Sequence, residues 1–225
     1  FYNLTLKELE TLIGALGKEK YRSRQLFKWI YNKNILDFDE MSNIPKSLRV
    51  IFKDMFDLRL LEIKDVLTSA DGTIKFGFLG EDGNLIESVL IPEKDRNTLC
   101  VSSQIGCRMG CKFCVTGKIG FIRNLNVSEI IGQFTGVKNY LDQKKITNIV
   151  FMGMGEPFDN IENFTRALEI MKDPAGLDFS HRKITVSSVG LIGGLKTMEP
   201  KTAGIAISLN AADDKTRSYL MPINR

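Results

Sequence analysis

The sequence predicts an α/β protein with a mostly parallel sheet. From residue 97 onward, short apolar segments alternate with segments whose apolar residues recur at helical spacing. Strands separated by helices are typical of βαβ units, in which the strands run parallel. The expected strands are 98–103, 146–152, 183–188 and 203–209, and the expected helices are 129–141, capped by Ser128, and 160–171.

Residues 1–58 are expected to form a separate helical domain. Thr5 and Glu8 match a capping box, and leucines and isoleucines then recur at helical spacing until Gly17. A second helix is expected over 21–31, and a third begins at Pro45. The basic side chains of this domain have two interpretations, contact with RNA phosphates or an ordinary solvated helix face.

Residues 59–96 are expected to form a β-hairpin connector to the core domain, which covers 97–225. Segments 63–67, 73–79 and 84–91 have the character of strands. The turns between them contain Asp71-Gly72 and Asp82-Gly83, and Asp-Gly is a strong hairpin signal.

Composition excludes some classes of protein and leaves others open. With 43% hydrophobic and 26% charged residues in 225, the chain resembles an ordinary globular protein. No segment approaches the roughly 18 apolar residues of a membrane-spanning helix, and the first residues do not form a secretory signal. The net charge of +4 permits a nucleic-acid partner without requiring one. We therefore expect a cytoplasmic monomer with no membrane partner, and the missing initiator Met suggests that the chain begins inside a longer protein.

The four cysteines are the most informative residues. All lie between Cys100 and Cys114, which is typical of a metal or redox site in a reducing compartment. Cys107, Cys111 and Cys114 form a C-x3-C-x2-C run directly after an expected strand. Three thiolates on one loop can hold three irons of a cubane cluster, which leaves the fourth iron open to a substrate. Two alternatives stay open: a zinc site with Cys100 as fourth ligand, and a set of inert buried thiols.

The C-x3-C-x2-C run, with Phe113 before its last cysteine, resembles the signature of radical S-adenosylmethionine enzymes. Further segments resemble the adenine carbon-2 methyltransferases of 23S rRNA and tRNA, and the similarity extends over essentially all 225 residues. Gly155-Glu156-Pro157, Trp29 and the final Pro-Ile-Asn-Arg favour this branch over a related family that methylates carbon 8. The matching segments are 24–31, 99–107, 114–117, 151–157 and 220–225.

The resemblance implies a partial radical-SAM (β/α) barrel behind an RNA-binding accessory domain. It implies a 4Fe–4S cluster on Cys107, Cys111 and Cys114. It assigns Glu87 an acid/base role at the adenine and makes Cys100 the thiol that resolves an enzyme–RNA adduct. It also implies S-adenosyl-L-methionine binding by Gly155, Glu156, Ser187, Ser208, Leu209 and Asn210.

The implied reaction uses a methylated cysteine as a methyl carrier and a flavodoxin-type electron donor. Cys100 would then form a disulfide bond with the carrier and release 2-methyladenosine. Relatives continue beyond Arg225 for about a third of their length, and the carrier cysteine is expected there, so we expect this chain to fail in turnover. A radical enzyme acting on protein or small molecules, and a zinc-stabilised RNA-binding module, are the alternative functions.

Overall fold

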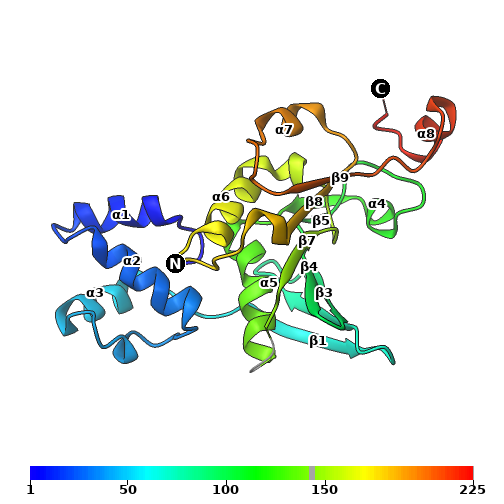
Figure 1. Cartoon of the computed structure of the whole chain (residues 1–225). Helices are drawn as coiled ribbons and strands as arrows, with labels where there is room; N and C mark the ends of the chain where they lie inside the picture. The colour runs from blue at the N-terminus through cyan, green and yellow to red at the C-terminus, as the bar shows by residue number, and fades with distance from the viewer. Residues whose placement is uncertain (142–144, 225) are drawn as a thin grey trace.

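The computed structural model describes residues 1–141 and 145–224. Figure 1 shows helices from the first quarter of the chain on one side and a sheet with its own helices on the other. The sheet belongs to the part of the chain that carries the cysteines.

The N-terminal helices follow from capping and amphipathic spacing. Thr5 caps the first helix, and the capping box with Glu8 is complete, as the sequence predicts. The second helix ends at Phe27, and a π-helical turn that buries Ile30 and Tyr31 continues it. The elements are α1 (Leu6–Ala15), α2 (Tyr21–Phe27), η1 (Lys28–Asn32), η2 (Phe38–Glu40) and α3 (Lys46–Met55).

One seven-stranded sheet contains both the expected connector and the expected core. Its order is β1-β2-β3-β4-β7-β8-β9, antiparallel from β1 to β4 and parallel from β4 to β9. The region 59–96 is therefore continuous with the core sheet rather than a separate hairpin. Among the described residues the sheet is open, with β1 and β9 at its edges. Its strands are β1 (Glu62–Thr68), β2 (Ile74–Leu79), β3 (Leu85–Glu93), β4 (Arg96–Cys100), β7 (Asn148–Phe151), β8 (Ile184–Ser188) and β9 (Gly204–Ile207).

The remaining elements connect these strands. The strand expected over 98–103 ends at Cys100, and a short second sheet, β5 with β6, follows it. The helix expected from 129 begins at Val127, because Asn126 and not Ser128 caps it. The elements are β5 (Gln104–Gly106), α4 (Val115–Ile119), β6 (Phe121–Asn124), α5 (Val127–Tyr140), η3 (Pro157–Asn160), α6 (Ile161–Lys172), η4 (His181–Lys183), α7 (Ile192–Thr197) and α8 (Asp214–Leu220).

The two faces of the sheet have different environments. Leu99, Ile149 and Ile184 are fully buried beneath the helices. The register places Cys100 beside Val150, and Val150 beside Thr185, in a row on the opposite face. These three side chains are only partly buried, so alternation along each strand separates a packed face from an accessible one.

Polar contacts join the N-terminal helices to the core. Arg166 of α6 donates to the Asn3 carbonyl at 2.6 Å and to the Glu8 carboxylate at 2.9 Å. Lys138 of α5 donates to the Tyr31 carbonyl at 2.7 Å. These contacts place the N-terminal helices beside α5 and α6, on the opposite side of the core from α4 and α8 (Figure 1). Within the described residues, no helix is both long and apolar enough to cross a bilayer.

Candidate active site

The three motif cysteines lie on the loop between β5 and α4, beyond the carboxyl end of β4. The β5–β6 hairpin closes this loop at its base, where the Cys107 N–H donates to the Gly120 carbonyl at 3.0 Å. Gly106 has φ +72°, and a Cβ there would lie 1.7 Å from the Gly120 oxygen. Only glycine fits this approach, so the sequence around the cysteines determines how tightly the loop folds.

A cavity of about 290 Å³ opens at this loop. Segments from the ends of three parallel strands meet the thiols there, as expected for a ligand site at the carboxyl edge of an α/β sheet. Larger cavities, of about 400 to 660 Å³, lie elsewhere, and no cysteine lines them. Lining residues of the thiol cavity include Cys107, Cys111, Cys114, Met152, Gly155, Glu156, Ser187, Val189, Ser208, Asn210 and Met221.

Burial favours the protonated form of two of the motif thiols, Cys107 and Cys111. It raises the pKa of Cys107 to about 11 and also raises the pKa of Cys111. Because metal-bound cysteines are thiolates, metal binding at this loop would release protons. Met109 and Met221 are buried beside these cysteines and form an apolar wall around the loop. Such a wall limits water access and helps to set the potential of a bound cluster.

The three motif cysteines supply the donors that a cubane cluster needs. In the part of the chain that the structure describes, no three His, Cys, Asp or Glu side chains are close enough to hold one metal ion. A zinc site needs every sulfur within about 2.3 Å of one ion, whereas each thiolate of a cubane cluster binds a different iron. Cys100, the proposed fourth zinc ligand, does not line the cavity.

Glu156 lies at the end of β7 and bridges two strand ends. Its carboxylate accepts the Val189 N–H at 2.9 Å and the Phe158 N–H at 3.2 Å. Burial raises the pKa of Glu156, and the hydrogen bonds from these two amides oppose the rise. The carboxylate thus connects the segment after β7 to the residue after β8. Glu156 also lines the cavity.

The side chain of Gln104 holds the backbone of Glu156 in position. Its Oε1 accepts the Glu156 N–H at 2.9 Å, and its Nε2 donates at 2.8 Å to both Asn124 and Asp159. Gly155 has φ +99°, and a Cβ there would lie 2.6 Å from the Gln104 Cβ. Position 155 therefore requires glycine, because any side chain there would be strained at this φ and would clash with Gln104.

The other predicted cofactor residues gather at the ends of β8 and β9. The Ser187 and Ser208 hydroxyl groups are 3.3 Å apart, and both residues line the cavity. Asn210 lines it as well, and its Nδ2 donates to the Met221 sulfur at 3.4 Å. Leu209 does not line the cavity, and 63% of its surface is exposed.

Glu87 and Cys100 lie apart from the cavity but share one face of the sheet. Cys100 is paired with Val89, two residues along β3 from Glu87. Glu87 forms an ion pair with Lys75, and its backbone carbonyl accepts the Ser102 hydroxyl at 2.6 Å. Burial raises the pKa of the Cys100 thiol, which is therefore protonated at rest.

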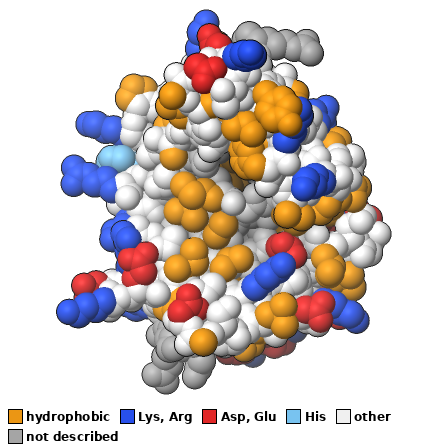
Figure 2. Space-filling model, turned by 90° about the vertical axis from the view of Figure 1, so that its right-hand side faces the viewer, with side chains coloured by type: hydrophobic (Ala, Val, Ile, Leu, Met, Phe, Trp, Pro, Cys, Tyr) orange, Lys and Arg blue, Asp and Glu red, His pale blue; other side chains and the backbone are white. Residues whose placement is uncertain are grey.

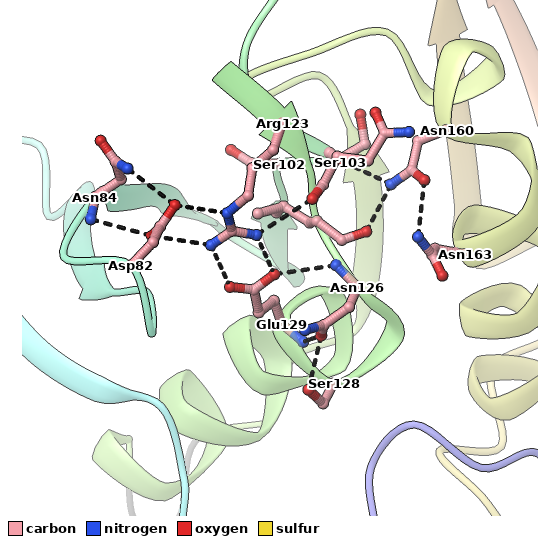
Figure 3. A network of polar contacts seen from close by, with 12 residues as sticks. Asp82, Asn84, Ser102, Ser103, Arg123, Asn126, Ser128, Glu129, Asn160 and Asn163 are labelled. Atoms are coloured by element: carbon pink, nitrogen blue, oxygen red, sulfur yellow. Dashed lines mark hydrogen bonds and ion pairs between the residues drawn. The ribbon is translucent and has the colours of Figure 1, made fainter. Parts of the chain in front are cut away.

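A polar network supports the strand that carries Cys100. Arg123 lies between Asp82 in the β2–β3 turn and Glu129 at the start of α5 (Figure 3). Glu129 is 2% exposed and also accepts the Asn126 N–H at 3.0 Å. The side chain of Asn160 donates to the backbone carbonyls of Ser103 and Leu125. The network connects β3, β6 and α5 around the base of the cysteine loop.

Sequence reasoning missed Gln104, Arg217 and Met221. Gln104 carries a usable signal, because it lies three residues before Cys107 at the end of an expected strand, where a buried amide needs specific partners. Arg217 and Met221 lie more than 100 residues after the cysteines, and only the fold brings them to the loop. The face around the cavity is also rich in hydrophobic side chains (Figure 2).

Comparison with known proteins agrees with this geometry. Three thiols beside strand-end serines and a buried glutamate define a cofactor-dependent α/β enzyme, and the model of the radical SAM superfamily matches residues 101–225. The model of the ribosomal RNA large subunit methyltransferase N-terminal domain matches residues 1–58. The chain belongs to the radical SAM superfamily.

Individual relatives support the same family. The dual-specificity RNA methyltransferase RlmN of Geotalea uraniireducens is 47% identical over 99% of this chain and 64% of its own length. RlmN of Bdellovibrio bacteriovorus is 43% identical over all of this chain and 57% of its own. A crystal structure of a radical SAM methyltransferase from Sphaerobacter thermophilus has a TM-score of 0.90 at 41% identity, with 100% of this chain and 67% of that chain covered. The chain thus spans less than two thirds of the length of these curated relatives.

Proposed function

We propose that this chain is the cluster- and cofactor-binding part of an RNA methyltransferase that methylates carbon 2 of adenosine in 23S rRNA and tRNA. The observation that carries the proposal is the meeting of the three motif thiols with Gly155, Glu156 and the two strand-end serines in one cavity. The match of residues 1–58 to an rRNA methyltransferase domain supports RNA as the substrate.

Cys107, Cys111 and Cys114 would hold a 4Fe–4S cluster, and the cavity beside them would hold S-adenosyl-L-methionine. When bound, the cluster supplies one-electron reductive cleavage of the cofactor, with the electron coming from a flavodoxin-type donor. Gly155 and Glu156 line the cavity, together with Ser187, Ser208 and Asn210, whose side chains have hydrogen-bond donors and acceptors. These groups can orient a ligand that has both amino and hydroxyl groups.

Glu87 and Cys100 would act on the RNA side of the reaction. Both lie on the accessible face of the sheet, within reach of a base placed over that face. The raised pKa of Cys100 means that it must lose its proton before it attacks the carrier cysteine. Glu87 is an acid/base candidate on the same face, where its carboxylate pairs with Lys75.

Residues 1–58 would bind RNA as an accessory domain, and 59–96 would connect it to the core at 97–225. We propose that the protein works as a monomer in the cytoplasm. The four cysteines are free in the structure. The disulfide between Cys100 and a carrier cysteine would form only during the proposed reaction.

The test is mass spectrometry of rRNA and tRNA from a strain that lacks the gene. We expect 2-methyladenosine to disappear and to return when the natural protein is supplied. Loss of 8-methyladenosine instead would identify the related carbon-8 activity. Unchanged methyladenosine in both RNAs would contradict the proposed function, and loss from only one RNA would restrict the substrate to that RNA.

A further inference from the structure

One side chain of α8 reaches back across the carboxyl edge of the sheet. Arg217 Nη2 donates to the Val189 carbonyl at 2.7 Å and to the Ser208 carbonyl at 3.4 Å. Its Nε donates to the Leu209 carbonyl at 3.2 Å, and its Nη1 donates to the Asn224 side chain. A single guanidinium therefore joins the residues that directly follow β8 and β9.

The same helix is packed against the cysteine loop. The Lys112 N–H, next to Cys111, donates to the Leu220 carbonyl at 2.9 Å. Met221 follows the helix, is fully buried and contacts the apolar cluster that contains Cys107 and Cys111. Arg217 thus projects from an element that contacts the thiol loop toward the strand ends on the other side of the cavity.

The charge of Arg217 is not neutralised by an ion pair. All four of its hydrogen-bond acceptors are neutral oxygen atoms, and no carboxylate pairs with it among residues 1–141 and 145–224. The helix that carries Arg217 contacts the cysteine loop through the hydrogen bond from the Lys112 N–H to the Leu220 carbonyl. A positive charge on this helix would interact favourably with the negative charge of a thiolate-ligated cluster on the loop.

We propose that Arg217 is a positioning residue of the cofactor site, a role that rests on the proposed function. Its planar fork holds the strand ends that carry Ser187, Ser208 and Asn210, and its charge stabilises the anionic, thiolate-ligated cluster. A guanidinium can donate to several carbonyls at once, whereas a lysine ammonium is a compact point charge. Charge near an iron–sulfur cluster is one of the factors that set its reduction potential.

Two substitutions separate the geometry from the charge. Arg217→Lys keeps the positive charge but loses the planar guanidinium, whereas Arg217→Gln loses both the charge and the guanidinium. We expect each to raise the Kd for S-adenosyl-L-methionine about tenfold, the lower end of the usual effect of outer-shell changes. Only Arg217→Gln should lower the reduction potential, because the reduced cluster carries the greater negative charge. The matched control is Lys215→Gln, on the same helix and exposed.

The experiment measures iron content, a redox titration and the cofactor-induced change in the electron paramagnetic resonance signal of anaerobically reconstituted protein. Equal cofactor affinity in all four proteins would overturn the positioning role. An unchanged potential in Arg217→Gln would overturn the role of the charge. If the parent protein binds cluster but no cofactor, the proposed function fails instead.

Hydrogen exchange of the metal-free protein tests the geometry independently of any cofactor. The Val189 amide donates to Glu156 at 2.9 Å, and the Ser208 amide donates to the Ser188 carbonyl at 2.8 Å. Both amides should exchange faster in Arg217→Gln than in Lys215→Gln. Equal exchange rates at these two positions would contradict the proposal that Arg217 holds the ends of β8 and β9 in position. This result would not depend on whether a cluster is bound.

Discussion

The side-chain amide of Gln104 accepts the backbone N–H of Glu156 at 2.9 Å, across a separation of 52 residues. Gln104 is fully buried and lies three residues before the first motif cysteine, whereas Glu156 lines the cavity at the end of β7. Asp159 accepts from the same amide and also pairs with Arg108 inside the cysteine loop at 2.7 Å. The thiol loop and the Gly155-Glu156 strand end are thus held in one hydrogen-bonded unit.

This relationship predicts that Gln104→Leu weakens cofactor binding. The variant leaves the Glu156 N–H buried without an acceptor, which costs about 1–3 kcal/mol of folding stability. We expect a Kd for S-adenosyl-L-methionine about tenfold higher at unchanged iron content, measured on reconstituted protein. Gln25→Leu, in the N-terminal helices, is the matched control. A Kd equal to that of the control would contradict the assigned role of Gln104.

Glu156→Ala tests whether the carboxylate connects the strand ends. The change removes the acceptor for the Val189 and Phe158 amides, so we expect a loss of about 2 kcal/mol in the free energy of unfolding together with weaker cofactor binding. Glu156→Gln keeps one oxygen for these amides and should lie between Ala and the parent. Denaturant unfolding of the metal-free protein measures the first effect. Full stability of Glu156→Ala would show that the two hydrogen bonds contribute nothing.

Arg123→Met should destabilise the core because it leaves Glu129 charged and buried. Glu129 is 2% exposed, and breaking a buried ion pair on one side typically costs about 3–5 kcal/mol. Arg96→Met removes the same kind of side chain from a surface pair with Glu93, where about 1 kcal/mol or less is expected. Equal losses in the two variants, measured by urea unfolding, would contradict the importance of the network in Figure 3.

The same network predicts a dependence of stability on pH. Hydrogen bonds from Arg123 and Asn84 hold the pKa of Asp82 well below its usual range. Because the folded pKa is below the unfolded value of about 3.9, the stabilisation by Asp82 is complete above that pH and is lost as the pH falls toward the folded pKa. Asp82→Asn should therefore be less stable than the parent at neutral pH, with the difference shrinking below about pH 4. A constant difference across this range would contradict the assignment.

Local signals predicted most of the secondary structure and the thiol loop. The capping box at Thr5 and the Asp-Gly turns at 72 and 83 are encoded by neighbouring residues, and the structure confirms them. The predicted cap of α5, Ser128, was wrong by two residues. Asn126 and Ser128 both precede Glu129, but only Asn126 has the three-residue spacing to Glu129 that a capping box needs. Adjacent candidates of this kind differ too little in propensity for sequence to separate them.

Non-local contacts set the limit of the sequence prediction. The continuity of 59–96 with the core sheet depends on β3 pairing with β4, which no local pattern specifies. The position of Leu209 outside the cavity depends on the direction of a strand end, and the positions of Gln104 and Arg217 depend on partners 52 and 28 residues away. Family resemblance indicated which residues belong to the site, whereas only the structure shows which residues hold them in place.

The central claim is that the thiol cavity holds a 4Fe–4S cluster with one iron open to S-adenosyl-L-methionine. The most direct test is electron paramagnetic resonance of anaerobically reconstituted, reduced protein, recorded with and without the cofactor, with Cys111→Ala as the ligand variant. We expect about four irons per chain, a signal that changes on cofactor addition, and loss of most iron in Cys111→Ala. One zinc and no iron per chain, or a cluster signal that the cofactor leaves unchanged, would contradict the account.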